Sequence, residues 1–340
     1  MSEMLEKARN YETEKQVYVK KTTKPLFHVT APTGWINDPN GFSVYDGKIH
    51  LFYQYNPYQR EWGPMHWGHS VTDDMVRWEQ LPAAIAPDQE YDKAGCFSGS
   101  AIEADGKHVL VYTGVTRVKQ ADGSEQERQN QCIAFGDGKD YVKYEKNPVV
   151  TGEMLPEGCS RIDFRDPKIW KENDTYYLIV GNKNDNQVGQ VVLYSSKNLT
   201  DWKFEGKVLP TVDDDPTSDL HPSQVIERPK VIYNEKTGKF VMWMHIESPD
   251  YEKAHAGVAV CDSPTGAFTY LGSFKPNGAD SRDQTIFKDD DGKAYHICSS
   301  EWNSTLYISL LTDDYTKPSG TYVRRFIGQS REAPAVFKRN

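Results

Sequence analysis

The sequence predicts an all-β protein built from five repeated units. Short runs of alternating or aromatic residues recur along the chain, and turn pairs such as Asp46-Gly47 and Asp291-Gly292 interrupt them. No long amphipathic helical period lies between these runs. The units begin about 60 residues apart and each has room for about four strands, a pattern typical of β-propellers. The predicted fold is therefore a five-bladed β-propeller.

Residues 1–22 are expected to precede the propeller as a helix and an edge segment. Residues 1–16 are rich in charged helix formers and lack the apolar core of a signal peptide, so a short helix is expected there. Val17-Tyr18-Val19-Lys20 alternates in polarity, which predicts an edge strand. The run from Pro25 to Val29 is the expected entry into the first blade, and the propeller is expected to span residues 23–340.

Acidic residues open three of the five units. Asp38 follows an apolar pair and precedes Pro39, Asp166 precedes Pro167, and Glu227 stands two residues before a proline. Taken alone, an acid before proline is typical of an Asx turn at the end of a strand. Its recurrence predicts instead that several repeats build one site. The expected innermost strands begin near Asp38, Ser98, Asp166, Glu227 and Gln284.

Five motifs between about Lys24 and Pro210 resemble those of glycoside hydrolase family 32, the invertases and fructan hydrolases. They are Trp35–Gly41, Phe52–Pro57, Trp67–Ser70, Phe97–Ala101 and Phe164–Pro167. They occur in the order that the family has. The resemblance implies a five-bladed propeller and an activity on terminal β-fructosides.

Three carboxylates are the candidate catalytic residues. Hydrolysis of a glycosidic bond needs one carboxyl group to protonate the leaving oxygen and another to attack the anomeric carbon or activate water. By the resemblance, Asp38 is the nucleophile, Asp166 holds sugar hydroxyls, and Glu227 is the general acid and then the base. The negative charges of Asp38 and Asp166 would raise the pKa of Glu227. Pairing with Arg165 or Arg228 would have the opposite effect on a carboxylate.

The same resemblance implies a set of sugar-contacting side chains. They are Asn37, Gln54, Trp62, Trp67, Phe97, Ser98 and Arg165. Flat rings with polar edges suit packing against sugar faces. Each of these residues would otherwise serve blade packing or turn chemistry.

The second half departs from the family 32 pattern. An invertase-like chain is expected to have an acid-Cys-Pro-Asp opening in its fourth blade and a C-terminal β-sandwich, whereas this chain has Glu-Arg-Pro-Lys from Glu227 and no predicted sandwich. From about Val225 onward it resembles glycoside hydrolase family 43, close to the exo-β-1,3-galactanases. The motifs are Glu227–Tyr233, Ser263–Gly266, Ser281–Gln284 and Ser330–Pro334.

Two sets of blades are therefore expected, invertase-like over residues 23–210 and galactanase-like over 225–329. A partial strand is predicted over 330–340, docked on the first blade. The switch between the two sets indicates an engineered or recombined chain. By the second resemblance, Glu227 has a supporting role and Glu332 is the alternative acid.

Bulk properties restrict the partners. The net charge of −9 disfavours nucleic acid and anionic membranes, so a small neutral carbohydrate is the expected partner. His66 and His69 lack a third ligand, and His245, His255 and His296 stand apart on predicted strands, so neither metal nor cofactor is expected. The five cysteines are predicted to be free thiols. No long apolar span occurs, so a cytoplasmic protein is expected, with its oligomeric state left open.

Three functions remain open at this stage. The first is a retaining hydrolase of terminal β-fructosides such as sucrose. The second is a natural or engineered propeller with little or no catalytic activity. The third is a β-1,3-galactan exo-hydrolase. A carboxylate separation of about 5–5.5 Å favours retention and one of roughly 6.5–9.5 Å favours inversion.

Overall fold

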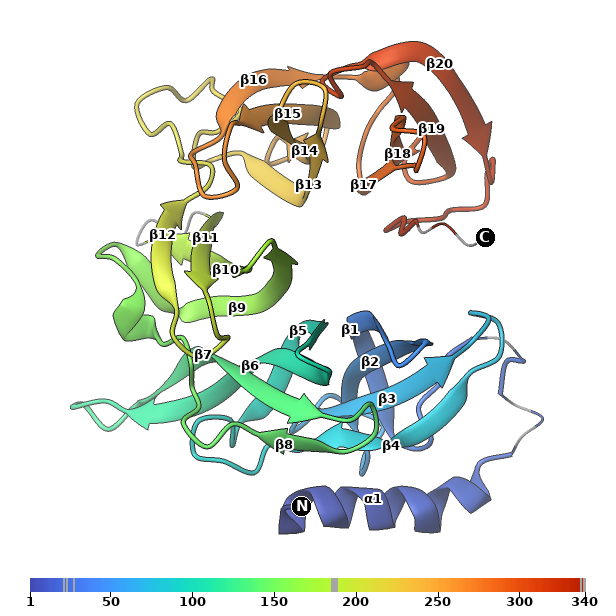
Figure 1. Cartoon of the computed structure of the whole chain (residues 1–340), viewed down its shortest axis with the longest axis vertical. Coiled ribbons are helices and arrows are strands. Elements are labelled where there is room, and N and C mark those ends of the chain that lie inside the picture. The colour runs from blue at the N-terminus through green and yellow to red at the C-terminus, as the bar shows by residue number, and fades with distance from the viewer. Residues whose placement is uncertain (21, 23, 27, 185–188, 337, 339–340) are drawn as a thin grey trace. The chain divides into compact units, whose positions relative to one another are not determined.

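The computed structural model describes residues 1–20, 22, 24–26, 28–184, 189–336 and 338 (Figure 1). One α-helix, α1 (Glu3–Lys15), begins the chain. The Ser2 hydroxyl accepts a hydrogen bond from the Leu5 amide at 3.2 Å, which caps the free N–H groups of the first turn. The helix predicted for residues 1–16 is therefore confirmed.

The α1 helix lies along β4 (Glu79–Ile85), the outer strand of the first sheet (Figure 1). Arg9 Nε donates to the Ala83 carbonyl at 2.9 Å, and the Ala83 amide donates to Glu12 Oε2 at 3.2 Å. Glu12 is buried, and this burial raises its pKa to about 7. The helix is thus held through an outer strand and carries a carboxyl group that is easily protonated.

The segment after α1 differs from the prediction. Residues Gln16–Tyr18 form a 3-10 turn, η1, instead of the predicted edge strand over residues 17–20. The Val19 amide donates to the Gln16 carbonyl at 3.1 Å, so the chain tightens into a turn at the end of the helix, and residues 16–18 form no strand. No strand forms among the described residues between 24 and 34, and Phe27 of the predicted entry strand lies outside them. The first strand begins instead at Trp35.

Five four-stranded sheets follow, each formed by four consecutive strands. The first contains β1 (Trp35–Tyr45), β2 (Lys48–Asn56), β3 (His66–Thr72) and β4. The second contains β5 (Gly95–Ala104), β6 (Lys107–Lys119), β7 (Glu125–Gly136) and β8 (Tyr141–Lys143). The third contains β9 (Cys159–Glu172), β10 (Thr175–Asn184), β11 (Gly189–Ser196) and β12 (Lys203–Lys207).

The last two sheets have the same up-and-down order. The fourth contains β13 (Val225–Asn234), β14 (Lys239–Glu247), β15 (His255–Cys261) and β16 (Thr269–Phe274). The fifth contains β17 (Gln284–Lys288), β18 (Ala294–Ser300), β19 (Thr305–Leu311) and β20 (Pro318–Arg325). Short 3-10 turns occur at η3 (Gly152–Met154) and η4 (Pro276–Gly278). These five meanders are the blades of the predicted all-β, five-bladed propeller.

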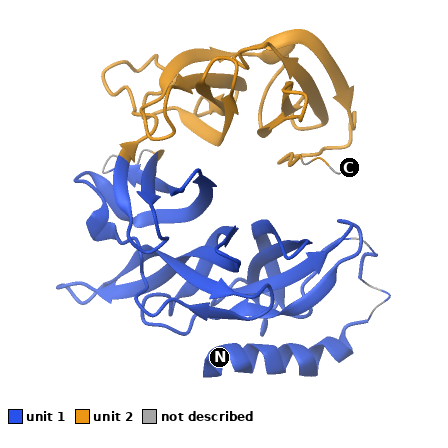
Figure 2. Ribbon diagram, in the orientation of Figure 1, with its two compact units in different colours: residues 1–185, 191–205 blue, residues 186–190, 206–340 orange. Residues whose placement is uncertain are grey.

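The chain divides into two compact units (Figure 2). Unit 1 is residues 1–185 and 191–205, and unit 2 is residues 186–190 and 206–340. The division at residue 206 is near residue 210, the predicted end of the invertase-like blades. Blades one to three belong chiefly to unit 1, and blades four and five belong to unit 2.

Each unit has its own apolar core. In unit 1, Val111 of β6, Phe164 of β9 and Tyr194 of β11 are fully buried in one cluster. In unit 2, fully buried Trp243 of β14 packs with Val258 of β15. Because the middle strands of a blade are covered on both faces, their sequences are nearly continuously apolar rather than strictly alternating.

The described part of the C-terminal segment forms no strand, contrary to the prediction for residues 330–340. Ser299 Oγ donates to the Arg331 carbonyl at 3.0 Å, the Ala333 amide donates to Asp283 Oδ2 at 3.0 Å, and Lys338 pairs with Asp289 at 2.6 Å. These contacts give the backbone and side chains of the segment partners on β18 and on the residues that flank β17, so the segment is held without pairing as a strand. Residue 337 of the predicted strand lies outside the described residues.

Candidate active site

Asp38 lies inside β1, not at a strand end as the turn signal predicts. The register of β1 against β2 shifts between Ile36 and Pro39, so Asn37 and Asp38 occupy a β-bulge. A bulge leaves its residues outside the regular pairing and redirects their side chains. Trp35 Nε1 donates to Asn37 Oδ1 at 2.7 Å, which fixes the neighbouring amide, and Asp38 is exposed.

The third blade repeats this arrangement at Asp166. The register of β9 against β10 shifts between Arg165 and Lys168, and Asp166 within this bulge has a left-handed φ of 62°. Its amide donates to Thr113 Oγ1 at 3.1 Å, which ties the bulge to β6 of the second blade. A positive φ is rare for residues other than Gly, Asn and Asp, so this backbone is held by its surroundings.

The electrostatics link Asp166 to Asp38. Although the Asp166 side chain is 62% exposed, desolvation by the surrounding protein raises the pKa of its carboxyl group. Arg165 lowers this pKa and the Asp38 charge raises it, and the net shift is upward. Arg165 is directed mainly at Asp163, at 2.9 Å against 4.0 Å to Asp166, so the simple Arg165–Asp166 salt bridge considered from the sequence is weak.

The second blade supplies Phe97 and Ser98 between these two carboxylates. The first strands are neighbours, since β1 contacts β5 and β5 contacts β9. The register of β5 shifts between Phe97 and Gly99, so Ser98 also lies at a bulge. Trp62 is 56% exposed and its ring meets Phe97 edge to face at 6.0 Å. Trp62, Phe97 and Ser98 are therefore accessible for contact with a ligand.

Two of the predicted sugar-contacting residues, Gln54 and Trp67, are buried. Gln54 Nε2 donates to the Cys96 carbonyl at 2.9 Å, and Trp67 Nε1 donates to the Phe97 carbonyl at 3.1 Å. Both side chains tie the first blade to β5, which corresponds to the packing role considered from the sequence. They position β5 and its bulge.

Glu227 of unit 2 lies at the corresponding place in the fourth blade. The register of β13 against β14 shifts after Glu227, and the next residue, Arg228, has a left-handed φ of 51°. Glu227 Oε2 is 3.1 Å from His245 Nδ1, and the Tyr251 hydroxyl donates to Glu227 Oε1 at 3.1 Å. The Glu227 side chain is 38% exposed, so it is held by two partners but remains accessible.

Arg228 does not pair with Glu227. Its guanidinium donates to both oxygens of Asp283, from Nε to Oδ1 at 2.8 Å and from Nη2 to Oδ2 at 3.1 Å. This bidentate geometry directs the arginine charge toward the approach to the fifth blade. The Ala333 amide donates to the same Asp283 carboxylate. Exposed Glu332 is the residue before Ala333, so its backbone lies next to the Arg228–Asp283 pair.

Sequence reasoning missed the residues behind Glu227. His245 is buried and its Nε2 is 3.3 Å from Oε1 of fully buried Glu247. Arg282 Nη1 donates to the same Glu247 oxygen at 3.2 Å. The sequence signal that could have found them is the spacing of two residues between His245 and Glu247, because this spacing places both side chains on one face of a strand.

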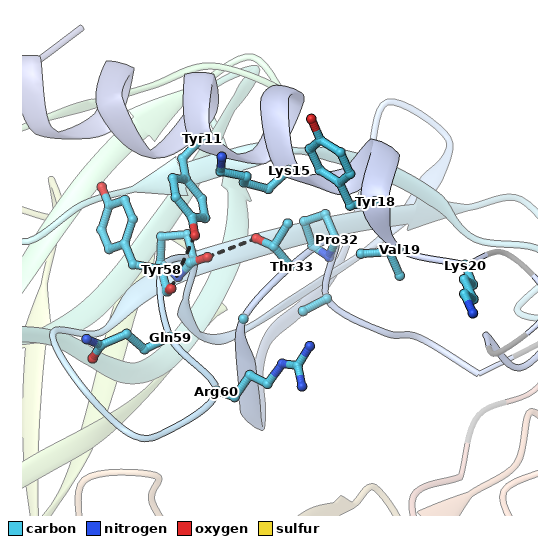
Figure 3. A pocket seen from close by; sticks show the side chains of 13 residues that line it. Tyr11, Lys15, Tyr18, Val19, Lys20, Pro32, Thr33, Tyr58, Gln59 and Arg60 are labelled. Carbon is cyan, nitrogen blue, oxygen red and sulfur yellow. Dashed lines mark hydrogen bonds between the residues drawn. The ribbon is translucent and has the colours of Figure 1, made fainter.

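Over the residues that the structure describes, no cluster of three or more His, Cys, Asp or Glu side chains could hold a metal ion. Within the same residues, no helix is both long and apolar enough to cross a membrane. A pocket of about 600 Å³ adjoins α1, with Tyr11, Tyr58 and Arg60 in its lining (Figure 3). None of the predicted catalytic or sugar-contacting residues lines this pocket.

The relatives of the chain include proteins named sucrose-6-phosphate hydrolase and levanase. The chain is 43% identical to sucrose-6-phosphate hydrolase of Escherichia coli over 192 residues, which are 56% of this chain and 39% of that protein. It is 38% identical to levanase of Bacillus subtilis over 192 residues, which are 55% of this chain and 26% of that protein. The matched part therefore spans well under half of these relatives.

Solved structures give a concordant result. A β-fructofuranosidase of Bombyx mori superposes with a TM-score of 0.64 at 30% identity, over 92% of this chain and 65% of that one. An exo-β-1,3-galactanase of Clostridium thermocellum matches 51% of this chain at 38% identity, but its TM-score of 0.45 is too low to support an assignment.

The family model described as the glycosyl hydrolases family 32 N-terminal domain matches residues 28–301, which include most of both units. The predicted resemblance to this family is thus confirmed, and the match extends beyond residue 210 into the half that departs from the family's motifs. The chain belongs to glycosyl hydrolase family 32.

Proposed function

We propose that the chain is a retaining glycoside hydrolase that cleaves terminal β-fructosides, with sucrose and short fructans as substrates. The observation that carries this proposal is the placement of Asp38 and Asp166, two exposed carboxylates that lie on bulges of first strands in unit 1. Family membership supports fructoside chemistry, and the names of the matched sucrose-6-phosphate hydrolase and levanase agree with it.

The proposed reaction uses three carboxyl groups. An Asp38 oxygen forms a bond to the anomeric carbon while Glu227 gives its proton to the leaving oxygen. Asp166 holds sugar hydroxyls and stabilises the positive charge of the oxocarbenium-like transition state. Glu227 then removes a proton from water, whose oxygen displaces Asp38. Two inversions at the same carbon retain its configuration.

Half-buried Asn37 and Ser98 and the exposed Trp62, near the first two carboxylates, would bind the fructosyl group. Asn37 is fixed by Trp35, and Ser98 occupies the β5 bulge. Trp62 offers an exposed ring beside Phe97 on which a sugar face can pack. The sugar itself is uncharged, which is compatible with the overall negative charge of the protein.

The test is to incubate purified protein with sucrose, sucrose-6-phosphate, levan and β-1,3-galactan and to measure released monosaccharides. Fructose release from a fructoside is expected, and proton NMR of the first-formed product should show β-fructose. The phosphorylated substrate is included because several matched relatives are named for it. Galactose release without any action on fructosides would overturn the proposal, as would an α-configured first product.

A second candidate is a propeller that binds sugar without turnover. It is favoured by the Glu-Arg-Pro-Lys opening from Glu227, where the family 32 resemblance leads one to expect acid-Cys-Pro-Asp. Calorimetric binding of fructose by folded protein that releases no product would support this candidate. The engineered or recombined origin and the alternative acid Glu332 stay predictions, and Glu332→Gln tests the latter by its effect on turnover.

A further inference from the structure

The side chain of His245 stands between two carboxylates. Its Nδ1 is 3.1 Å from Glu227 Oε2 and its Nε2 is 3.3 Å from Glu247 Oε1. The ring is buried, at 3% exposure, and Glu247 is completely buried, whereas Glu227 remains partly open to solvent. A continuous path therefore runs from an accessible carboxyl group on β13 to an inaccessible one on β14.

The number of protons on this path is restricted by its geometry. A neutral imidazole has one N–H donor and one acceptor nitrogen, whereas an ionised carboxylate only accepts. Glu247 Oε1 already accepts from the Ala254 amide and Arg282, so it also accepts from His245, and both contacts of His245 are then hydrogen bonds in two arrangements. In one, imidazolium donates to two carboxylates, and in the other, neutral His245 donates from Nε2 to Glu247 and accepts at Nδ1 from protonated Glu227. The two arrangements differ by the transfer of one proton between Glu227 and His245.

Glu247 is anchored by groups that compensate for its burial. The Ala254 amide donates to its Oε1 at 2.6 Å and Arg282 Nη1 donates to the same atom at 3.2 Å. Arg282 also donates to the Tyr251 carbonyl at 3.0 Å and lies over the Trp302 ring at 4.2 Å. An isolated buried carboxylate is costly, so this arginine and amide allow Glu247 to remain a fixed acceptor.

We propose that His245, held by Glu247 and Arg282, is the positioning residue of Glu227 and shares the proton that Glu227 donates and recovers. The proposal rests on the function proposed above, in which Glu227 is the acid and base. The Glu227–His245 pair loses one proton to the leaving oxygen in the first step and regains one from water in the second. No other reactant is required.

The charged groups around the His245 ring decide where the shared proton is held. The ring faces Glu227 on β13 and Glu247 on β14, while Tyr251 and Arg282 bind these carboxylates rather than the ring. Arg228 on β13 and Asp283 before β17 neutralise one another. A proton shared by Glu227 and His245 therefore lies between two carboxyl groups, and replacing His245 removes one of the two side chains that can hold it.

The activity test compares His245→Asn with a matched control, His255→Asn. His255 lies on the adjacent strand β15 and bonds to Ser273 Oγ at 2.9 Å, with no contact to Glu227. His245→Asn should move the alkaline limb of the kcat/KM profile to lower pH by about one unit and lower kcat more than KM changes. His255→Asn should keep the wild-type profile. A His245→Asn profile superimposable on that of the wild type would overturn the proposal.

A second measurement does not depend on turnover. With ¹⁵N-labelled histidine, NMR follows the titration of the His245 ring in wild-type protein, in Glu227→Gln and in Glu247→Gln. Each glutamine removes one negative charge, so the ring should lose its proton at lower pH in both variants. Unchanged titration in both would refute the shared proton. Inactivity of wild-type protein on every fructoside, with the NMR shifts present, would instead refute only the proposed function.

Discussion

The carboxylates of the two units are positioned by different means. In unit 1, Asp38 and Asp166 are exposed on β-bulges, and backbone geometry directs them. In unit 2, Glu227 also borders a bulge, but His245 and Tyr251 hold both of its oxygens. A nucleophile needs direction and an open approach, whereas an acid and base needs partners that tune its proton. This difference between the units fits the roles proposed above, with Asp38 as nucleophile and Glu227 as acid and base.

The largest expected loss of activity comes from replacing Asp38, the proposed nucleophile of unit 1. Asp38→Asn keeps the shape of an exposed residue and removes the attacking oxygen charge, so activity on sucrose should fall by at least about 10⁴-fold. Circular dichroism and the melting temperature should match those of the wild type. The control is Asp46→Asn, in the turn of the same blade, which should retain activity. Residual activity above a tenth of wild type would remove Asp38 from the mechanism.

The next largest loss of activity is expected from replacing Glu227, the proposed acid and base of unit 2. Glu227→Gln retains the contacts of its side chain but cannot donate a proton, so turnover of sucrose should fall by about 10²–10⁴-fold. Aryl fructosides, whose leaving groups need little protonation, should lose much less. Glu235→Gln, an exposed residue of the same blade that pairs with Lys288, is the control. Equal losses on both substrate types would contradict an acid role for Glu227.

Glu12 of α1 extends the comparison to a buried carboxyl group. Glu12 has a pKa of about 7 in the folded protein against about 4.5 when unfolded, because burial disfavours its charge. The folded state binds the extra proton, so stability is fully present below pH 4.5 and is lost as pH rises through 7. Glu12→Gln should therefore stabilise the protein at pH 8 by about 1–3 kcal/mol and change little at pH 5. Thermal melts at both pH values check this, and a larger gain at pH 5 would contradict it.

The smallest expected effect concerns the C-terminal segment of unit 2. Deletion of residues 331–340 removes the Ala333–Asp283 hydrogen bond and the exposed Lys338–Asp289 pair. Exposed pairs contribute about 0–1 kcal/mol, so the melting temperature should fall by only about 1–4 °C. The single variant Lys338→Ala should reproduce only part of this fall. A melt lowered by more than 10 °C would show that the segment has a structural role beyond these contacts.

The sequence by itself determined the fold class and the order of the blades. Turn pairs and aromatic strands recur with one spacing, and such a repeat can bury its apolar faces only by forming successive sheets. The three acid openings also marked the places where the first strands of blades one, three and four carry register shifts, at Asp38, Asp166 and beside Glu227.

Only the tertiary structure decided what surrounds these residues. Local pattern could not distinguish an edge strand from the 3-10 turn at Gln16–Tyr18, because that turn depends on how the preceding helix ends. Gln54 became an interblade tie since its partner, the Cys96 carbonyl, comes from another sheet. His245 appeared isolated in the sequence, yet its two carboxylate partners lie on β13 and β14 of the same blade. Periodicity specifies which face a side chain occupies, whereas its hydrogen-bond partners follow from the register of neighbouring strands.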